Sequence, residues 1–297
     1  MHLRLGRVPI VVASSAPRAE EAMKTRDLDF ASCPRLLMVD RFFYSTRGIA
    51  FAPYGDHWHQ ARRICATHML SACRVTSLGG VRAEEAAALG GRVLRAGISG
   101  GVMNLSDSLI VARRVFEKMY VLLERVIADH CQRRRVATRD DEGDFVDVML
   151  DDDELDTDNN KSIILDVLVA ARASTFALLE WAMAELINHP HEMRRLQVEV
   201  RTAVSPAVSA VVKEAHLPRL PYLKGVIYET LRLHPPSPLL LLRETLEDTR
   251  LLGYNVSAGA RVLINAWANG RDPATWGPCA VINLLAIVRC TQRGSPN

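Results

Sequence analysis

The stretch YLKGVIYETLRLHPPSP, residues 222–238, combines a helical pattern with an abrupt stop. A helix is expected over residues 222–234, because the run of prolines that begins at 235 prevents it from continuing. Glu229 and Arg232 lie three residues apart, the spacing at which two side chains share one helix face. Their flanks are apolar, so we expect a buried ion pair. Such a pair needs further hydrogen-bond partners to offset the desolvation of both charges.

The segments on either side of this helix indicate the fold class. Residues 239–270 contain short apolar runs separated by glycine turns, which predict small strands. Arg243 follows four leucines at the end of such a strand, where a lone cation needs an anionic partner. Upstream, residues 160–189 are apolar nearly all round, a pattern typical of a helix buried in a large domain.

The remaining segments complete the expected architecture. The first 15 residues alternate like a hairpin, Ser15 is expected to cap the next helix, and further helices are predicted from Asp56 and over 191–204. An Ala-rich helix with glycine stops at both ends is expected within 78–101. No internal repeat appears. The sequence therefore predicts one mainly α-helical domain with a small β-sheet.

A cluster of histidines and cysteines occupies residues 55–73. His57 and His59 are two apart and point to different sides of a helix. Cys65 and His68 share a face, but no second ligand pair follows elsewhere to complete a tetrahedral site. We therefore expect no metal to be bound by these side chains.

Trp58 and Arg62 lie within the same stretch and are one helical turn apart. An indole N–H and a guanidinium on one face can reach the same acidic ligand group. The alternative interpretation is an arginine stacked on a tryptophan at the surface.

Composition excludes some classes of protein. The chain has 297 residues, 48% hydrophobic and 24% charged, and its net charge of +3 is too small to indicate a nucleic-acid partner. Six cysteines without CxxC spacing favour a reduced compartment. The longest early apolar run, residues 8–13, is too short to span a bilayer.

Taken in order, four motifs between residues 3 and 276 resemble the cytochromes P450, in particular the plant microsomal type. They are WxxxR in FAPYGDHWHQARRIC, ExxR in YLKGVIYETLRLHPPSP, the downstream LLLLRE, and GYNVSAGARVLINAWANGRDPATW. The resemblance implies a mainly helical fold and a haem-thiolate monooxygenase, an oxidoreductase. It also implies a small apolar organic substrate, molecular oxygen and an NADPH-dependent flavoprotein reductase as partners.

The resemblance also implies roles for individual residues. Trp58 and Arg62 match the residues that hold a haem propionate, and Arg243 matches the arginine that does so from the sheet. Glu229 and Arg232 match the pair that braces the proximal side of the haem. The family is placed at the cytoplasmic face of the endoplasmic reticulum membrane, whereas this chain, without an anchor before Met1, is expected to be cytoplasmic.

The chain departs from the family after Trp276, where an FxxGxRxCxG-like loop with the iron-binding cysteine is expected. Cys279 and Cys290 lack the glycine and arginine at the required offsets, so no thiolate ligand is identified. We expect residues 277–297 to be an unrelated tail. The arginine that would complete the Glu229–Arg232 network is also missing, which predicts an under-satisfied pair.

The long helix departs as well. In the oxygen-site segment, residues 170–174, Ala171 replaces a glycine, Ala173 replaces an acid, and Ser174 keeps the catalytic hydroxyl. Arg172 would be costly to bury there without a partner. The passage between family helices over 108–135 is too short for the lid helices, so residues 1–276 are expected to form a partial, incomplete cytochrome P450 domain.

Two hypotheses follow. The chain is a haem monooxygenase by descent, inactive as written because the cysteine loop is absent. Alternatively, it is a non-enzymatic helical fragment or a mis-spliced gene product with at most weak haem binding.

Overall fold

The computed structural model describes residues 1–42, 46–98, 127–130, 132, 156–204 and 212–276. The described chain is mostly helical with one four-stranded sheet and one two-stranded sheet, which confirms the predicted fold class. Most of the stretch 108–135 and all of 277–297 lie outside the described residues. The chain divides into two compact units, Met1–Pro34 with Arg172–Asn297, and Arg35–Ala171.

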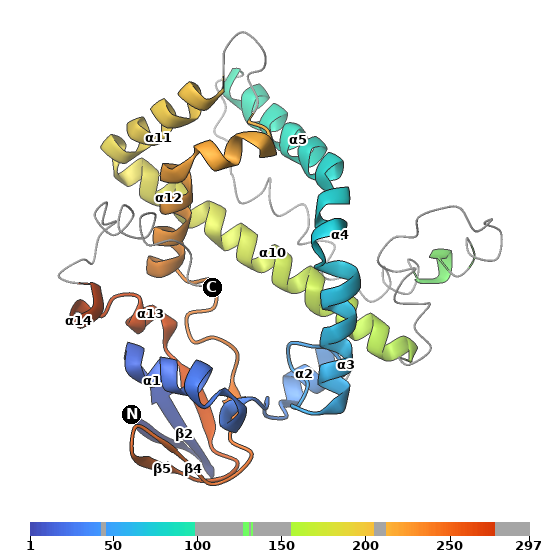
Figure 1. Ribbon diagram of the computed structural model, residues 1–297, viewed down its shortest axis with the longest axis vertical. Helices are drawn as coiled ribbons and strands as arrows, with labels where there is room; N and C mark the ends of the chain where they lie inside the picture. The colour runs from blue at the N-terminus through green and yellow to red at the C-terminus, as the bar shows by residue number, and fades with distance from the viewer. Residues whose placement is uncertain (43–45, 99–126, 131, 133–155, 205–211, 277–297) are drawn as a thin grey trace. The chain divides into compact units, whose positions relative to one another are not determined.

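The structure has the following elements (Figure 1). The strands are β1 His2–Leu5, β2 Val8–Ala13, β3 Arg243–Glu244, β4 Thr249–Leu251, β5 Tyr254–Val256 and β6 Arg261–Ile264. The helices are α1 Ala16–Glu20, α2 Leu37–Phe42, α3 Asp56–Ile64, α4 Ala72–Ser77, α5 Gly79–Ile98, α10 Thr157–Asn188, α11 Pro190–Ala203, α12 Pro221–Leu233, α13 Ala266–Asn269 and α14 Pro273–Trp276.

The four-stranded sheet of the first unit joins the beginning of the chain to its last strands. Its order is β1-β2-β6-β3, and β1 pairs antiparallel with β2 as the predicted hairpin. β2 and β6 are parallel, with Ile10 opposite Arg261 and Ala13 opposite Ile264. The blue and orange-red strands lie side by side in Figure 1. This pairing places β3, and with it Arg243, on the far edge of a sheet whose other edge is the first strand of the chain.

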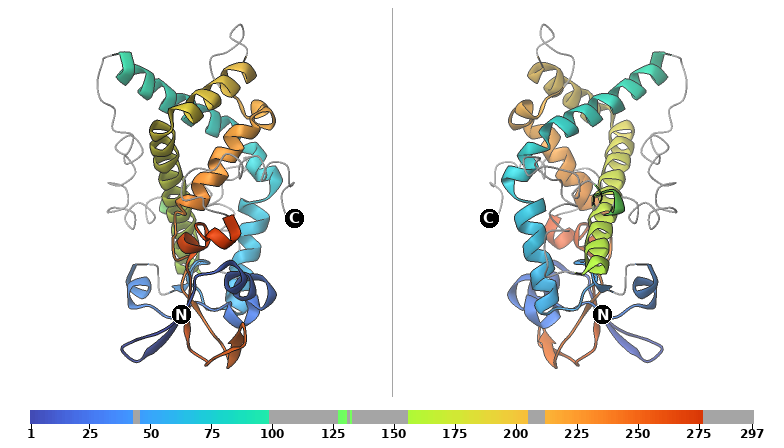
Figure 2. Two further views of the ribbon diagram at one scale, coloured as in Figure 1. Left: turned by 90° about the vertical axis from the view of Figure 1, so that its left-hand side faces the viewer. Right: turned by 90° about the vertical axis from the view of Figure 1, so that its right-hand side faces the viewer.

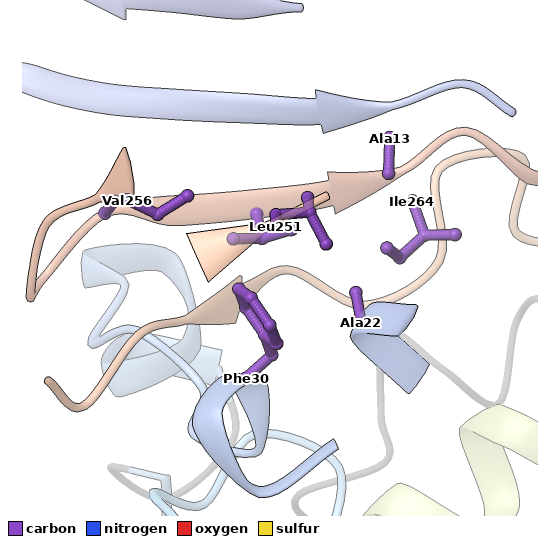
Figure 3. Packing of buried hydrophobic residues seen from close by; sticks show 8 residues of the cluster. Ala13, Ala22, Phe30, Leu251, Val256 and Ile264 are labelled. Atoms are coloured by element: carbon purple, nitrogen blue, oxygen red, sulfur yellow. The ribbon is translucent and has the colours of Figure 1, made fainter. Parts of the chain in front are cut away.

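The hydrophobic core of the first unit lies against this sheet (Figure 3). Phe30 is fully buried among side chains of β4, β5 and β6, which include Leu251, Val256 and Ile264. A tight turn at Leu252 and Gly253, both with positive φ, joins β4 to β5. The turn is held from outside by Glu21, whose carboxylate accepts the Leu252 N–H at 2.6 Å.

The second unit has a smaller core beneath α3. It consists of Ala61, Ile64 and Cys65 from α3 and the π-helical turn that follows, together with Ile163 of α10. Ile49 packs against this cluster from the loop before α3. The core therefore fixes the inner face of α3, whereas Arg62 and Arg63 lie outside it.

The long helix α10 appears as one continuous rod in Figure 2, with bounds close to the prediction. Complete burial was the wrong expectation: residues 161–166 are buried, but Leu168, Trp181 and Ile187 are exposed. An apolar composition predicts that a helix is buried, but it does not identify the elements that pack against it. By length and composition alone α10 could also cross a membrane. Because Asp166 and Glu185 make tertiary hydrogen bonds, we assign it to the domain.

The Ala-rich helix α5 lies within the predicted range 78–101 and continues through Gly90 and Gly91 to Ile98. One local expectation was wrong. Ser15 occupies the N-cap position of α1 without capping a backbone N–H, because its hydroxyl accepts from Arg18 instead at 3.1 Å. A neighbouring side chain thus outweighs the local capping signal.

Replacing Phe30 by Ala should lower the free energy of unfolding by about 3–5 kcal/mol, because it leaves a cavity between the sheet and the loop. Urea denaturation followed by circular dichroism measures the loss. Leu28→Ala, at an exposed position two residues earlier, is the control and should change stability by less than about 0.5 kcal/mol. Equal losses in the two variants would contradict this core assignment.

Candidate functional site

The predicted ion pair lies in the middle of α12 and is buried. The Arg232 Nε donates to Glu229 Oε2 at 2.7 Å and its Nη2 to Oε1 at 2.5 Å, a two-point contact between side chains that are 6% and 4% exposed. Helix α12 begins with Pro221 and ends at Leu233, one residue from each predicted bound. The apolar face of α12 packs against the protein interior, and the pair is buried with it.

The expectation that this pair is under-satisfied was wrong. A third nitrogen of Arg232 donates to the carbonyl of Gly270, and the guanidinium lies 5.0 Å from the centre of the Trp276 ring. Gly270 must be glycine, because a Cβ at this position would overlap the carbonyl oxygen of Arg232. The Trp276 indole N–H in turn donates to the carbonyl of Asn269 at 3.0 Å. The segment 269–276 therefore supplies the partners that a second arginine was expected to supply.

A second arginine lies close to this network. The Arg271 guanidinium stacks on the Trp267 ring at 4.3 Å. Burial, and secondly the positive charge of Arg232, lower the pKa of Arg271. The two cations are thus close enough to repel each other. Aromatic faces on both sides compensate part of this repulsion.

Both ends of α12 are fixed by side chains that sequence reasoning missed. At the C-terminal end the His234 ring stacks on Trp181 at 3.9 Å and contacts Glu185 Oε1 at 2.6 Å through Nε2. At the N-terminal end the two oxygens of Glu199 accept the N–H groups of Tyr222 and Leu223 at 2.8 and 2.9 Å. A carboxylate at this position satisfies free N–H groups and complements the helix dipole.

A buried acid reinforces the same junction between α11 and α12. The Tyr222 hydroxyl donates to Glu192, which is 7% exposed. Burial, and secondly the bond to Glu192, raise the pKa of Tyr222. The Arg195 guanidinium covers the Tyr222 ring at 4.6 Å. Helix α12 is consequently held at its start, its middle and its end.

Arg243 lies on β3 and is half-buried. Its Nη1 donates to the Phe30 carbonyl at 3.2 Å, and it forms no ion pair with an acid of the described chain. The predicted anionic partner is therefore not supplied by the described residues.

In the second unit, α3 brings Trp58 and Arg62 together as their spacing predicts. The Arg62 guanidinium lies 5.0 Å from the centre of the Trp58 ring, and the residue is exposed. The Trp58 indole N–H is not free to bind a ligand, because it donates to the Ile49 carbonyl at 3.2 Å. No carboxylate of the described residues pairs with Arg62.

The neighbouring residues His57, Cys65 and Cys73 are in ordinary structural environments. His57 Nε2 contacts the Arg47 carbonyl at 2.8 Å, and Cys73 is exposed. Cys65 is buried, and burial together with the nearby charge of Asp166 raises its pKa to about 11. The parts of the chain that the structure describes contain no group of three side chains placed to hold a metal.

The oxygen-site segment lies within α10. Ser174 and Ala171 are exposed and Arg172 is only half-buried, so the burial cost expected for this arginine is reduced. Trp58 and Arg62 belong to the second unit, whereas Ser174, Glu229, Arg232 and Arg243 belong to the first.

Comparisons with known proteins agree with these features. The family model for cytochrome P450 matches residues 1–109 and 106–279. (+)-Menthofuran synthase of Mentha piperita is 37% identical over 336 residues, covering 93% of this chain and 68% of that protein. Cytochrome P450 71A21 of Arabidopsis thaliana is 36% identical, covering 94% of this chain and 68% of that protein.

A zebrafish cytochrome P450 solved with progesterone has a TM-score of 0.84 at 22% identity, covering 98% of this chain and 81% of that chain. This likeness shows a shared fold. Fold and motifs define a haem monooxygenase. The chain belongs to the cytochrome P450 family and is similar to plant members of it.

Arg232→Met should lower the free energy of unfolding by about 3–5 kcal/mol, because Glu229 would remain as a buried charge without its partner. The double variant Glu229→Leu with Arg232→Met should recover most of this loss. Denaturant titration of both variants tests the prediction, and Lys224→Met, an exposed change on the same helix, serves as the control. Additive losses in the double variant would contradict a coupled buried pair.

Proposed function

We propose that Arg62 and Arg243 hold the propionates of haem, and that Trp58 contributes by stacking on Arg62, because its indole N–H is bound to the Ile49 carbonyl. We also propose that Glu229 and Arg232 brace the segment beneath the haem. Haem is the cofactor of the family, and when bound it supplies the activation of molecular oxygen. The observation that carries this proposal is that Arg62 and Arg243 have no acidic partner among the residues that the structure describes.

The two arginines fit a ligand that carries carboxylates. Within the described residues neither Arg62 nor Arg243 pairs with an Asp or Glu side chain. A guanidinium offers several N–H donors in a plane and binds carboxylates through two of them. Arg62 is moreover stacked on Trp58, which limits the orientations of its side chain. Each of these cations is therefore suited to bind one propionate carboxylate, the role that the family resemblance implies for both.

The Glu229–Arg232 pair has a different role in this proposal. It is fully buried and bonded to the backbone of Gly270, so it shapes the chain and does not bind substrate. We therefore assign Glu229 and Arg232 a positioning role in catalysis, because they hold the segment 269–276 in place.

Ser174 is proposed as the hydroxyl on the oxygen side of the haem. It lies on α10, an uninterrupted helix that carries exposed residues on both sides of this position. With Ala171 and Ala173 in place of the glycine and acid expected there, Ser174 is the proton-carrying side chain that the segment 170–174 retains from the family pattern.

We also propose that residues 1–276 form a partial P450 domain that lacks the lid helices, and that 277–297 is an unrelated tail. The family model matches in two stretches that meet at 106–109 and ends at 279. The alignment with menthofuran synthase spans 336 positions, more than the 297 residues of this chain. These breaks support a segment missing near 108–135. Without the cysteine loop we expect no monooxygenase activity from the chain as written.

The partners follow from the family. A P450 acts on an organic substrate with a redox partner, and we propose a small apolar substrate and an NADPH-dependent flavoprotein reductase. The plant relatives are membrane-anchored by family, and we propose the cytoplasmic face of the endoplasmic reticulum membrane as the place of action. The relative from Mentha piperita is named for menthofuran synthesis, which is compatible with a small apolar substrate.

Titration of the purified chain with haem, followed by absorbance, tests the propionate role. Arg62→Ala and Arg243→Ala should each weaken binding about 10- to 100-fold, because each removes a charge-assisted hydrogen bond. Arg63→Ala, one position along α3, is the matched control and should bind as the unchanged protein does. Arg62→Lys should recover only part of the affinity.

Unchanged affinity in both alanine variants would contradict the assignment. It would favour the alternative of a helical fragment that binds haem weakly and without these residues.

A further inference from the structure

A buried carboxylate of α10 holds the loop before α3. Asp166 is 6% exposed, and one of its oxygens, Oδ2, accepts the N–H groups of both Ile49 and Ala50, at 2.7 and 2.9 Å. All three residues belong to the second unit. Two successive backbone N–H groups on one carboxylate oxygen fix the orientation of both peptides.

The residue before these two peptides is adapted to the same contact. A Cβ on Gly48 would overlap Oδ2 of Asp166 and would also crowd the hydroxyl of Ser162, one turn earlier on α10. The loop therefore passes so close to α10 that only glycine leaves room for the carboxylate. This close approach is independent of the two hydrogen bonds and points to the same acid.

The peptide that Asp166 holds is also the one that receives Trp58. The Ala50 N–H, which belongs to the same peptide unit as the Ile49 carbonyl, donates to Asp166 at 2.9 Å, and that carbonyl accepts the Trp58 indole N–H at 3.2 Å. The Ile49 side chain packs on the core beneath α3, which includes Ile163. Arg62 then stacks on the Trp58 ring. A continuous chain of contacts thus leads from Asp166 to Arg62.

We propose that Asp166 is a positioning residue for Trp58 and Arg62, acting through the peptide unit between Ile49 and Ala50. Only the consequence for haem rests on the function proposed above. Burial raises the pKa of Asp166, and the bonds from Ala50 and Ile49 oppose that shift. Burial thus disfavours the charged form of Asp166, at a position where its carboxylate orients the loop before α3.

Hydrogen exchange of the tryptophan indole N–H groups, followed by NMR in the full chain without haem, tests the proposal. Asp166→Ala should accelerate exchange at Trp58 about tenfold or more, the factor that corresponds to one charge-assisted hydrogen bond. The Trp276 indole, bonded to Asn269 in the other unit, is the internal reference and should not change. Asp166→Asn keeps an acceptor oxygen and should retain most of the protection.

Two further variants separate positioning from general loss of stability. Ile164→Ala removes buried apolar volume from the same helix and should leave Trp58 protected relative to Trp276. Gly48→Ala keeps Asp166 in the chain but displaces its carboxylate, and should reproduce the effect of Asp166→Ala even where that variant folds poorly. The proposal is overturned if Trp58 exchange is unchanged, if both indoles accelerate equally, or if Ile164→Ala has the same selective effect.

The same variants, titrated with haem, keep the two proposals distinguishable. Accelerated Trp58 exchange with unchanged haem affinity supports positioning by Asp166 and contradicts the propionate role. Weaker haem binding with unchanged Trp58 exchange contradicts the positioning role.

Discussion

A carboxylate and a guanidinium are buried side by side in the middle of α12, and the C-terminal part of the first unit depends on their being fully paired. Removing two charges from water is expensive, and mutual attraction repays the cost only when the remaining N–H groups also find acceptors. Glu229 binds two nitrogens of Arg232, and the Gly270 carbonyl binds a third. The glycine, the tryptophan at 276 and the turn between them are therefore constrained by the needs of one guanidinium.

The same helix explains how distant segments are joined. Glu199 of α11 caps its first turn, and His234 ties its end to Glu185 of α10. Each of these contacts links residues far apart in sequence, so α12 connects α10, α11 and the segment 269–276. In the second unit Asp166 performs a comparable task for the loop before α3. In both units a carboxylate that accepts two backbone N–H groups, Glu199 or Asp166, therefore joins neighbouring elements.

The sequence predicts the elements better than their contacts. The prolines after Leu233 fix the end of α12, and the three-residue spacing predicts the pair Glu229–Arg232. The four-residue spacing likewise predicts that Trp58 and Arg62 meet. Gly270, Trp276 and Asp166 could not be identified as partners, because their contacts span 38 to 117 residues and have no local pattern. The prediction that α10 is completely buried failed for the same reason, because composition does not identify the elements that pack against the helix.

These results describe a cytochrome P450 chain that retains the proposed propionate anchors and the buried brace, but whose sequence offers no recognisable thiolate loop. The most direct test of this account is the absorbance spectrum of the haem-loaded chain, reduced and treated with carbon monoxide. A cysteine thiolate on iron shifts the Soret band in a characteristic way, because it donates electron density to the metal. The account predicts haem binding without a thiolate-type shift. A normal thiolate-type shift would contradict it and would show that Cys279 or Cys290 ligates the iron.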